Sequence, residues 1–176
     1  EAWVILDAEP GAQLIVGLQE GVTREQLKQA SLAGPDVEQL LRKVDVQPGD
    51  VYYIPAGIVH AICGGITLYE IQQSSDVTYR LYDWGRVDSA GRGRELHLDH
   101  SLAVLDLKGQ PEPAVPQVLQ EDAAGRLERM LDTPFFQLDR LTDCRGLSLA
   151  PDLDRFSVLT AFSPMTLAFE GGDVGL

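Results

Sequence analysis

Short apolar runs alternate with tight-turn sequences over the first 106 residues. The runs lie at residues 3–6, 13–18, 51–54, 66–71 and 78–82. The turns between them are rich in proline and glycine, at positions 10–11, 48–49, 55–57 and 64–65. Strands this short, at this spacing, are typical of a β-sandwich or β-barrel. We therefore expect this part of the chain to be mostly β.

One segment, residues 23–44, departs from the β pattern. Thr23 and Gln26 have capping-box spacing, which predicts a helix that ends near Gly34. A second helix is expected from Asp36, because the apolar residues at 37, 40, 41 and 44 have the spacing of one buried stripe. We expect this helical insertion to cover one side of the β structure.

The second half of the chain contains a proline-rich stretch. Residues 109–116, GQPEPAVP, include three of the ten prolines, so we interpret 109–125 as a linker. It would join a domain at 1–108 to part of a second, smaller β domain at 126–176. Strand-like runs are expected there at 135–141, 157–162 and 165–169. Both ends of the chain lie close to expected elements, which suggests a sequence cut from a longer fold.

The composition excludes several classes of function. The chain has 14 Lys and Arg against 27 Asp and Glu, a formal net charge of −13, which would repel nucleic acid and anionic lipid. No apolar run approaches the roughly 18 residues of a membrane span. Cys63 and Cys144 form no CxxC motif, so neither a disulfide framework nor a thiolate zinc site is encoded. A cytoplasmic protein is expected; its oligomeric state is not indicated.

The most specific motif covers residues 49–60, GDVYYIPAGIVH. Its pattern is a turn, a strand that ends at Pro55, a second turn that uses Gly57, and a histidine at the start of the next strand. This pattern resembles the second conserved motif of cupins: a glycine, five residues, Pro-x-Gly, two residues and a histidine. The resemblance implies a cupin-type β-barrel (jelly roll), with His60 as a metal ligand inside it.

The following run narrows the family. Residues 60–80, HAICGGITLYEIQQSSDVTYR, resemble the signature of type I mannose-6-phosphate isomerases, especially their short bacterial form. The opening EAWVILDAEPG and the block RELH at 94–97 are also similar to that family. The resemblance covers most of residues 1–107 and is thinner over 126–176. It implies a zinc-dependent enzyme that interconverts mannose 6-phosphate and fructose 6-phosphate.

The resemblance also implies roles for four residues. Glu1 and His60 correspond to zinc ligands, Arg80 to a catalytic arginine, and Arg86 to a position that contacts the substrate phosphate. The family's other ligands, a glutamine and a first histidine, would precede Glu1, as would a lysine. The 176-residue chain alone is therefore expected to bind zinc weakly and to be inactive.

The remaining histidines, His97 and His100, are expected to be structural. Neither has a ligand spacing that includes His60.

The chemistry explains why such residues belong together. Aldose–ketose isomerisation moves a proton between adjacent carbons through an enediol, so negative charge develops on the sugar oxygens. Zinc held by imidazole and carboxylate can act as a Lewis acid toward those oxygens. Arginine stays protonated and can donate two hydrogen bonds, which suits an electrostatic role for Arg80. Arginine is a poor general base, so the base is left unassigned.

These roles make geometric predictions. Two ligands of one zinc ion must lie roughly 3–4 Å apart. Alternation along the first strand should place Trp3 and Ile5 on the side of Glu1, and Arg80 should reach the same cavity. Two alternatives stay open: a non-catalytic sugar-binding or regulatory cupin with an incomplete metal site, and an iron or manganese oxygenase.

Overall fold

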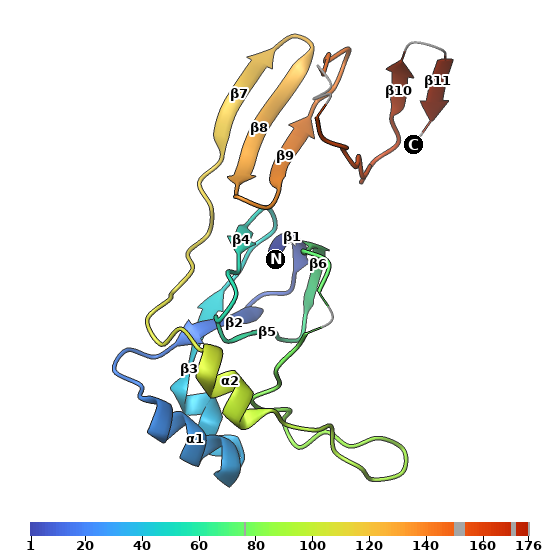
Figure 1. The fold of residues 1–176 in the computed structure, drawn as a ribbon. Coiled ribbons are helices and arrows are strands. Elements are labelled where there is room, and N and C mark those ends of the chain that lie inside the picture. Colours follow the sequence, from blue (N-terminus) through green and yellow to red (C-terminus); the bar gives the residue numbers. More distant parts are fainter. Residues whose placement is uncertain (76, 150–153, 170–171, 176) are drawn as a thin grey trace.

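The structure, a computed structural model, describes residues 1–75, 77–149, 154–169 and 172–175. Its elements are mostly short antiparallel strands, with two α-helices and one 3₁₀ helix among the described residues (Figure 1). In chain order they are β1 (Ala2–Ala8), β2 (Gln13–Leu18), α1 (Arg24–Ala33), η1 (Pro35–Leu40), β3 (Leu41–Asp45), β4 (Val51–Tyr53), β5 (His60–Ile62), β6 (Ile66–Ile71), α2 (Leu98–Val104), β7 (Gln117–Asp122), β8 (Gly125–Asp132), β9 (Gln137–Thr142), β10 (Thr166–Phe169) and β11 (Gly172–Gly175).

Two three-stranded antiparallel sheets form the N-terminal part, with strand orders β4-β1-β6 and β3-β2-β5. Apolar side chains from both sheets and from the turn after β4 pack into one buried cluster, which removes them from water. Its buried members are Trp3, Ile5, Leu14, Val16, Tyr52, Ile54 and Ile58. The mostly β prediction is confirmed, and the facing sheets are a cupin-like arrangement.

Strand β2 is buried on both of its faces. Leu14 and Val16 belong to the cluster between the sheets, whereas Ile15 packs into a second cluster with α1, η1 and α2. Gly17 has φ +89°, and the pairing of β2 with β3 shifts register there. Simple alternation would place Leu18 on the same face as Leu14 and Val16. The bulge instead turns Leu18 toward the second cluster, beside Ile15.

The first predicted helix is confirmed, including its cap. The Gln26 N–H donates to the Thr23 hydroxyl at 3.2 Å, and the Thr23 N–H donates to the Gln26 side chain at 2.9 Å.

In the described part of the chain, no helix combines the length and apolarity that a membrane span requires.

The second predicted helix is wrong beyond residue 40. η1 ends there, and residues 41–45 form β3. Leu41 pairs with Leu18, and Val44 pairs with Leu14 of β2. Val44 also packs toward the cluster between the sheets, so residues 37–44 do not form one helical stripe. Hydrogen bonding to β2, which lies far away in sequence, decides the conformation of this segment.

The other strand predictions differ in outcome. The runs at 13–18 and 66–71 coincide with β2 and β6. Residues 77–82 form no strand, and the backbone of Arg80 bonds to His97 instead. Residues 157–162 are also irregular, although this segment contacts β6: the Tyr69 hydroxyl lies 3.1 Å from that of Thr160, and its ring packs edge-on against Phe162.

The expected linker at 109–125 is partly a strand and partly an extended strap, the residues before β7. Residues 117–122, expected within the linker at 109–125, form β7, which pairs with β8. The residues before β7 run along the N-terminal sheets (Figure 1). The Pro111 carbonyl accepts from Arg42 at 3.0 Å, and the Ala114 N–H donates to the Val51 carbonyl at 2.7 Å. Prolines remove N–H donors but leave carbonyls free to accept, so the strap bonds to the sheets without joining them.

Gly57 provides a test of the turn that precedes His60. Its φ is +89°, and an added Cβ would lie 2.7 Å from the Val104 carbonyl oxygen. Its own carbonyl accepts from the Asp106 N–H at 2.9 Å. Gly57→Ala should therefore lower the free energy of unfolding by about 3 kcal/mol, through backbone strain and steric overlap together. Denaturant unfolding of the full-length protein measures this loss.

Gly11→Ala is the matched control. Gly11 also has a positive φ, +81°, but nothing lies within 4 Å of its added Cβ. Strain alone should cost about 1 kcal/mol there. Equal losses in the two variants would show that the approach of residues 104–106 to the turn is unimportant.

Candidate metal and active site

Glu1 and His60 are in direct contact. The Glu1 carboxylate Oε1 lies 3.1 Å from His60 Nε2, and the two side chains are 18% and 40% exposed. Ile54 donates its N–H to the Glu1 carbonyl at 2.8 Å, which fixes Glu1 beside the end of β4. The turn at residues 55–57 then leads the chain back to His60 at the start of β5. The separation of the two side chains is in the range expected for ligands of one ion.

The His60 ring is oriented by a backbone carbonyl. Nδ1 lies 2.8 Å from the Ile58 carbonyl oxygen, which can only accept, so Nδ1 carries the proton. In the neutral ring Nε2 then presents a lone pair to the Glu1 carboxylate. Two acceptors this close repel each other unless a cation or a second proton lies between them. The same arrangement orients histidine ligands in metal sites.

Trp3 supports the pair from the side. Its ring packs edge-on against His60, with centroids 5.5 Å apart, and its Nε1–H donates to Glu70 at 3.2 Å. Trp3 and Glu70 are direct partners in the β1–β6 ladder. Trp3 therefore lies on the side of Glu1, as alternation predicts, and Ile5 packs in the same cluster as Trp3.

The donor set fits a metal ion but is small. A carboxylate oxygen and an imidazole nitrogen are ligands that zinc accepts. Among the described residues, no group of three or more His, Cys, Asp or Glu side chains could hold a metal. Glu1 and His60 would supply two ligands, and the zinc sites of enzymes use three from protein.

The hydrogen bonds of Arg80 are made to residues other than Glu1 and His60. Its guanidinium Nη1 donates to the Glu95 carbonyl at 3.2 Å, and its N–H donates to His97 Nδ1 at 3.1 Å. The segment between β6 and α2 that carries Arg80 extends away from β1 and β4 (Figure 1). The expected approach of Arg80 to Glu1 and His60 is not among these contacts.

Arg86 is part of a separate charged cluster around Asp83. Arg86 pairs with the Asp83 carboxylate at 3.0 Å and lies over the Trp84 ring at 5.2 Å. Arg94 Nε donates to the same carboxylate at 2.8 Å. Asp83 is 5% exposed, and these cations offset the cost of burying its charge.

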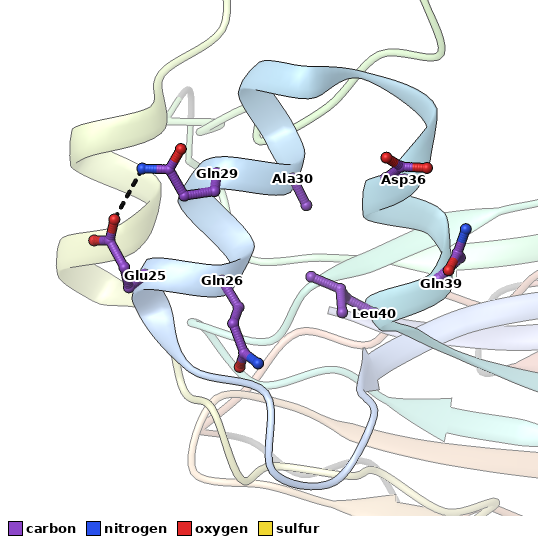
Figure 2. Close-up of a pocket in the computed structure, with 7 residues that line it drawn as sticks. All are labelled: Glu25, Gln26, Gln29, Ala30, Asp36, Gln39 and Leu40. Atoms are coloured by element: carbon purple, nitrogen blue, oxygen red, sulfur yellow. Dashed lines mark hydrogen bonds between the residues drawn. The ribbon is translucent and has the colours of Figure 1, made fainter.

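A surface hollow lies between α1 and η1 (Figure 2), and neither Glu1 nor His60 lines it. Five of its lining residues carry polar side chains, but much of the surface that they present is aliphatic: Glu25, Gln26, Gln29, Ala30, Asp36, Gln39 and Leu40. Gln29 donates to Glu25 at 2.9 Å across one helical turn, so these two polar side chains bond to each other within α1. It adds no residue to the site described above.

Curated relatives of this chain are named as mannose-6-phosphate isomerases. A mannose-6-phosphate isomerase of Streptococcus mutans is 42% identical over 136 residues, which are 77% of this chain and 42% of that protein. The mannose-6-phosphate isomerase ManA of Bacillus subtilis is 46% identical over 112 residues, which are 64% of this chain and 35% of that protein. No protein-family profile matches the chain.

The fold agrees with the sequence comparison. The crystal structure of a mannose 6-phosphate isomerase from Bacillus subtilis matches with a TM-score of 0.71 at 30% identity, over 80% of this chain and 44% of that one. The chain is therefore homologous in sequence and in fold to these mannose-6-phosphate isomerases. It spans less than half the length of the relatives it matches.

The sequence analysis placed Trp3 on the side of Glu1 but missed the contacts that orient His60. Trp3 and Glu70 support His60, yet their contact depends on the β1–β6 register, which no local pattern reveals. The Ile58 carbonyl belongs to the backbone and has no signature in side-chain chemistry. Asp83 carried one usable signal: it is an acidic residue close to several arginines in the sequence.

The Asp83 cluster predicts an acid-sensitive contribution to the stability of this mannose-6-phosphate isomerase homologue. The hydrogen bond from Arg94, together with the charges of Arg86, Arg94 and Arg80, lowers the pKa of the Asp83 carboxyl against the opposing effect of desolvation. A carboxyl whose pKa is lowered by folding stabilises the protein above its unfolded-state pKa and loses that effect as the pH falls. Asp83→Asn should therefore lower the Tm near neutrality, and the gap from wild type should shrink between about pH 6 and about pH 3.

Thermal unfolding of the full-length wild-type and Asp83→Asn proteins across that pH range measures the gap. A gap of constant size would mean that the packing of Asp83, and not its charge, stabilises the loop. Asp132→Asn is a comparison for an exposed carboxylate. The Asp132 side chain is 61% exposed and its carboxylate lies 3.9 Å from Arg129, and exposed pairs contribute little.

Proposed function

We propose that the protein containing this chain is a zinc-dependent isomerase that interconverts mannose 6-phosphate and fructose 6-phosphate. The observation that carries the proposal is the 3.1 Å contact between His60 Nε2 and the Glu1 carboxylate, beside a His60 Nδ1 that is held by the Ile58 carbonyl. It is supported by the relatives of this chain, which are named mannose-6-phosphate isomerases. The proposed site requires at least one ligand beyond Glu1 and His60.

In this proposal the residues of the site have separate roles. Glu1 and His60 hold the ion, and the Ile58 carbonyl keeps the proton on Nδ1 so that Nε2 is available. Bound zinc would supply Lewis acidity toward the sugar oxygens. Arg80 would donate hydrogen bonds to oxygens that gain negative charge as the proton moves between adjacent carbons.

Arg86 is the proposed contact for the substrate phosphate. Its side chain is 61% exposed, so it is accessible to a second partner in addition to Asp83. Arginine can bind phosphate with two parallel hydrogen bonds. A small phosphorylated sugar is therefore the proposed partner. Cys63 and Cys144 are free thiols, which supports a cytoplasmic location for the protein.

The test is an isomerase assay of the full-length protein. Conversion of mannose 6-phosphate to fructose 6-phosphate, followed by NMR, should occur with zinc, stop with a chelator and resume when zinc is restored. Binding of mannose 6-phosphate without turnover would instead indicate a non-catalytic sugar-binding cupin. Oxygen consumption with iron or manganese would indicate an oxygenase.

A further inference from the structure

Arg80 is held at both of its backbone polar groups by one residue. Its N–H donates to His97 Nδ1 at 3.1 Å, and its carbonyl accepts from the His97 N–H at 2.8 Å. The Arg80 guanidinium donates to the carbonyl of Glu95, which lies two residues before His97. Fixing both backbone groups restricts the φ and ψ of Arg80, and these angles set the direction in which its long side chain leaves the chain.

The contact defines the state of the His97 ring. A backbone N–H can only donate, so Nδ1 must be an unprotonated acceptor, and the neutral ring carries its proton on Nε2. This is the opposite tautomer from His60, whose Nδ1 donates to a carbonyl. No sequence pattern connects His97 with Arg80, which lies 17 positions earlier.

Helix α2, which follows His97, is anchored by contacts that do not involve the His97 ring. Leu102 is buried in the core beneath α1. Arg24 of α1 donates to the Leu102 and Leu105 carbonyls at 3.0 and 2.9 Å. Lys28 of α1 pairs with Asp99 at 3.2 Å. Loss of the His97 side chain should therefore leave α2 in place and remove the acceptor that faces Arg80.

We propose that His97 is a positioning residue for Arg80, which orients the guanidinium for isomerisation by accepting the Arg80 N–H at Nδ1. The proposal rests on the proposed function, in which Arg80 touches the substrate. A long side chain converts a small backbone rotation into a large displacement at its tip, and catalytic groups must be held within fractions of an ångström. His97 thus acts through Arg80 and need not touch the sugar.

The test uses steady-state kinetics of the full-length, zinc-loaded protein. His97→Ala should lower kcat by about 10- to 100-fold with little change in KM, because the guanidinium is misplaced. His97→Asn keeps an acceptor oxygen close to the position of Nδ1 and should recover most of the loss. His100→Ala is the matched control: His100 stacks on Tyr79 with centroids 5.3 Å apart, and its described contacts do not include Arg80.

A double-mutant cycle separates positioning from general stability. In the Arg80→Ala background there is no guanidinium to orient, so His97→Ala should cause no further loss of kcat. Three results would overturn the inference: an unchanged kcat in His97→Ala, equal losses in the alanine and asparagine variants, or multiplicative losses in the double variant.

One readout does not depend on activity. Nitrogen-15 NMR of the His97 ring in the wild-type protein should show Nδ1 unprotonated and Nε2 protonated. A protonated Nδ1 would contradict the contact itself. If wild-type protein fails to turn over mannose 6-phosphate, the proposed function is wrong, and the ring measurement still decides whether His97 accepts from Arg80.

Discussion

Replacing Arg80 with alanine in the full-length protein should lower kcat by about 10²–10³-fold and change KM far less. The reason is that its hydrogen bonds would be made to charge that develops as the enediol forms. An interaction made only in the transition state affects turnover and hardly affects substrate binding. Steady-state kinetics with mannose 6-phosphate, at saturating and limiting substrate, separates the two parameters.

Arg92→Ala is the matched control for this variant. Arg92 is an arginine of the same loop, its side chain is 80% exposed, and it pairs with Asp88 at 3.0 Å. Its loss should leave kcat within about twofold of wild type, because an exposed ion pair contributes little. An unchanged kcat in Arg80→Ala would remove the electrostatic role assigned to that residue.

Replacing His60 should abolish stable zinc binding and, with it, isomerase activity. Loss of a residue that only orients a ligand typically weakens metal affinity by roughly 10–100-fold, so loss of a ligand should cost more. His60→Gln preserves much of the side-chain volume and limits disturbance of the ring contact with Trp3. Metal content after dialysis and the isomerase assay are the two measurements.

His100→Ala again serves as the control, since it removes an imidazole that is not part of the Glu1–His60 pair. Circular dichroism and the Tm show whether each variant is folded. A folded His60→Gln protein that kept one tightly bound zinc and wild-type turnover would place the metal site elsewhere in the protein.

Local sequence patterns predicted the elements whose conformation is decided locally. The Thr23–Gln26 capping box identified the start of α1, because both hydrogen bonds lie within one turn. The turns at 10–11 and 64–65 delimited β2 and β6 in the same way. Residues 41–45 were misjudged, because their apolar spacing suits a helix and only pairing with β2 makes them a strand.

The same distinction between local and long-range contacts applies to the candidate site. The contact between Glu1 and His60 followed from the resemblance and from the alternation of β1, and the structure brings the two side chains together. Residues 78–82 were expected to form a strand that reaches the same cavity. Arg80 instead bonds to His97, which lies 17 positions later at the end of an irregular loop, and no local pattern specifies this pairing.

The most direct measurement is the position of the metal in crystals of the full-length protein. Anomalous diffraction at the zinc absorption edge should show one strong peak about 2.0–2.2 Å from a Glu1 carboxylate oxygen and from His60 Nε2. His60 Nδ1 should still donate to the Ile58 carbonyl. A peak bound by other residues, or zinc-saturated crystals in which His60 Nε2 donates directly to Glu1 with no ion between them, would contradict the account.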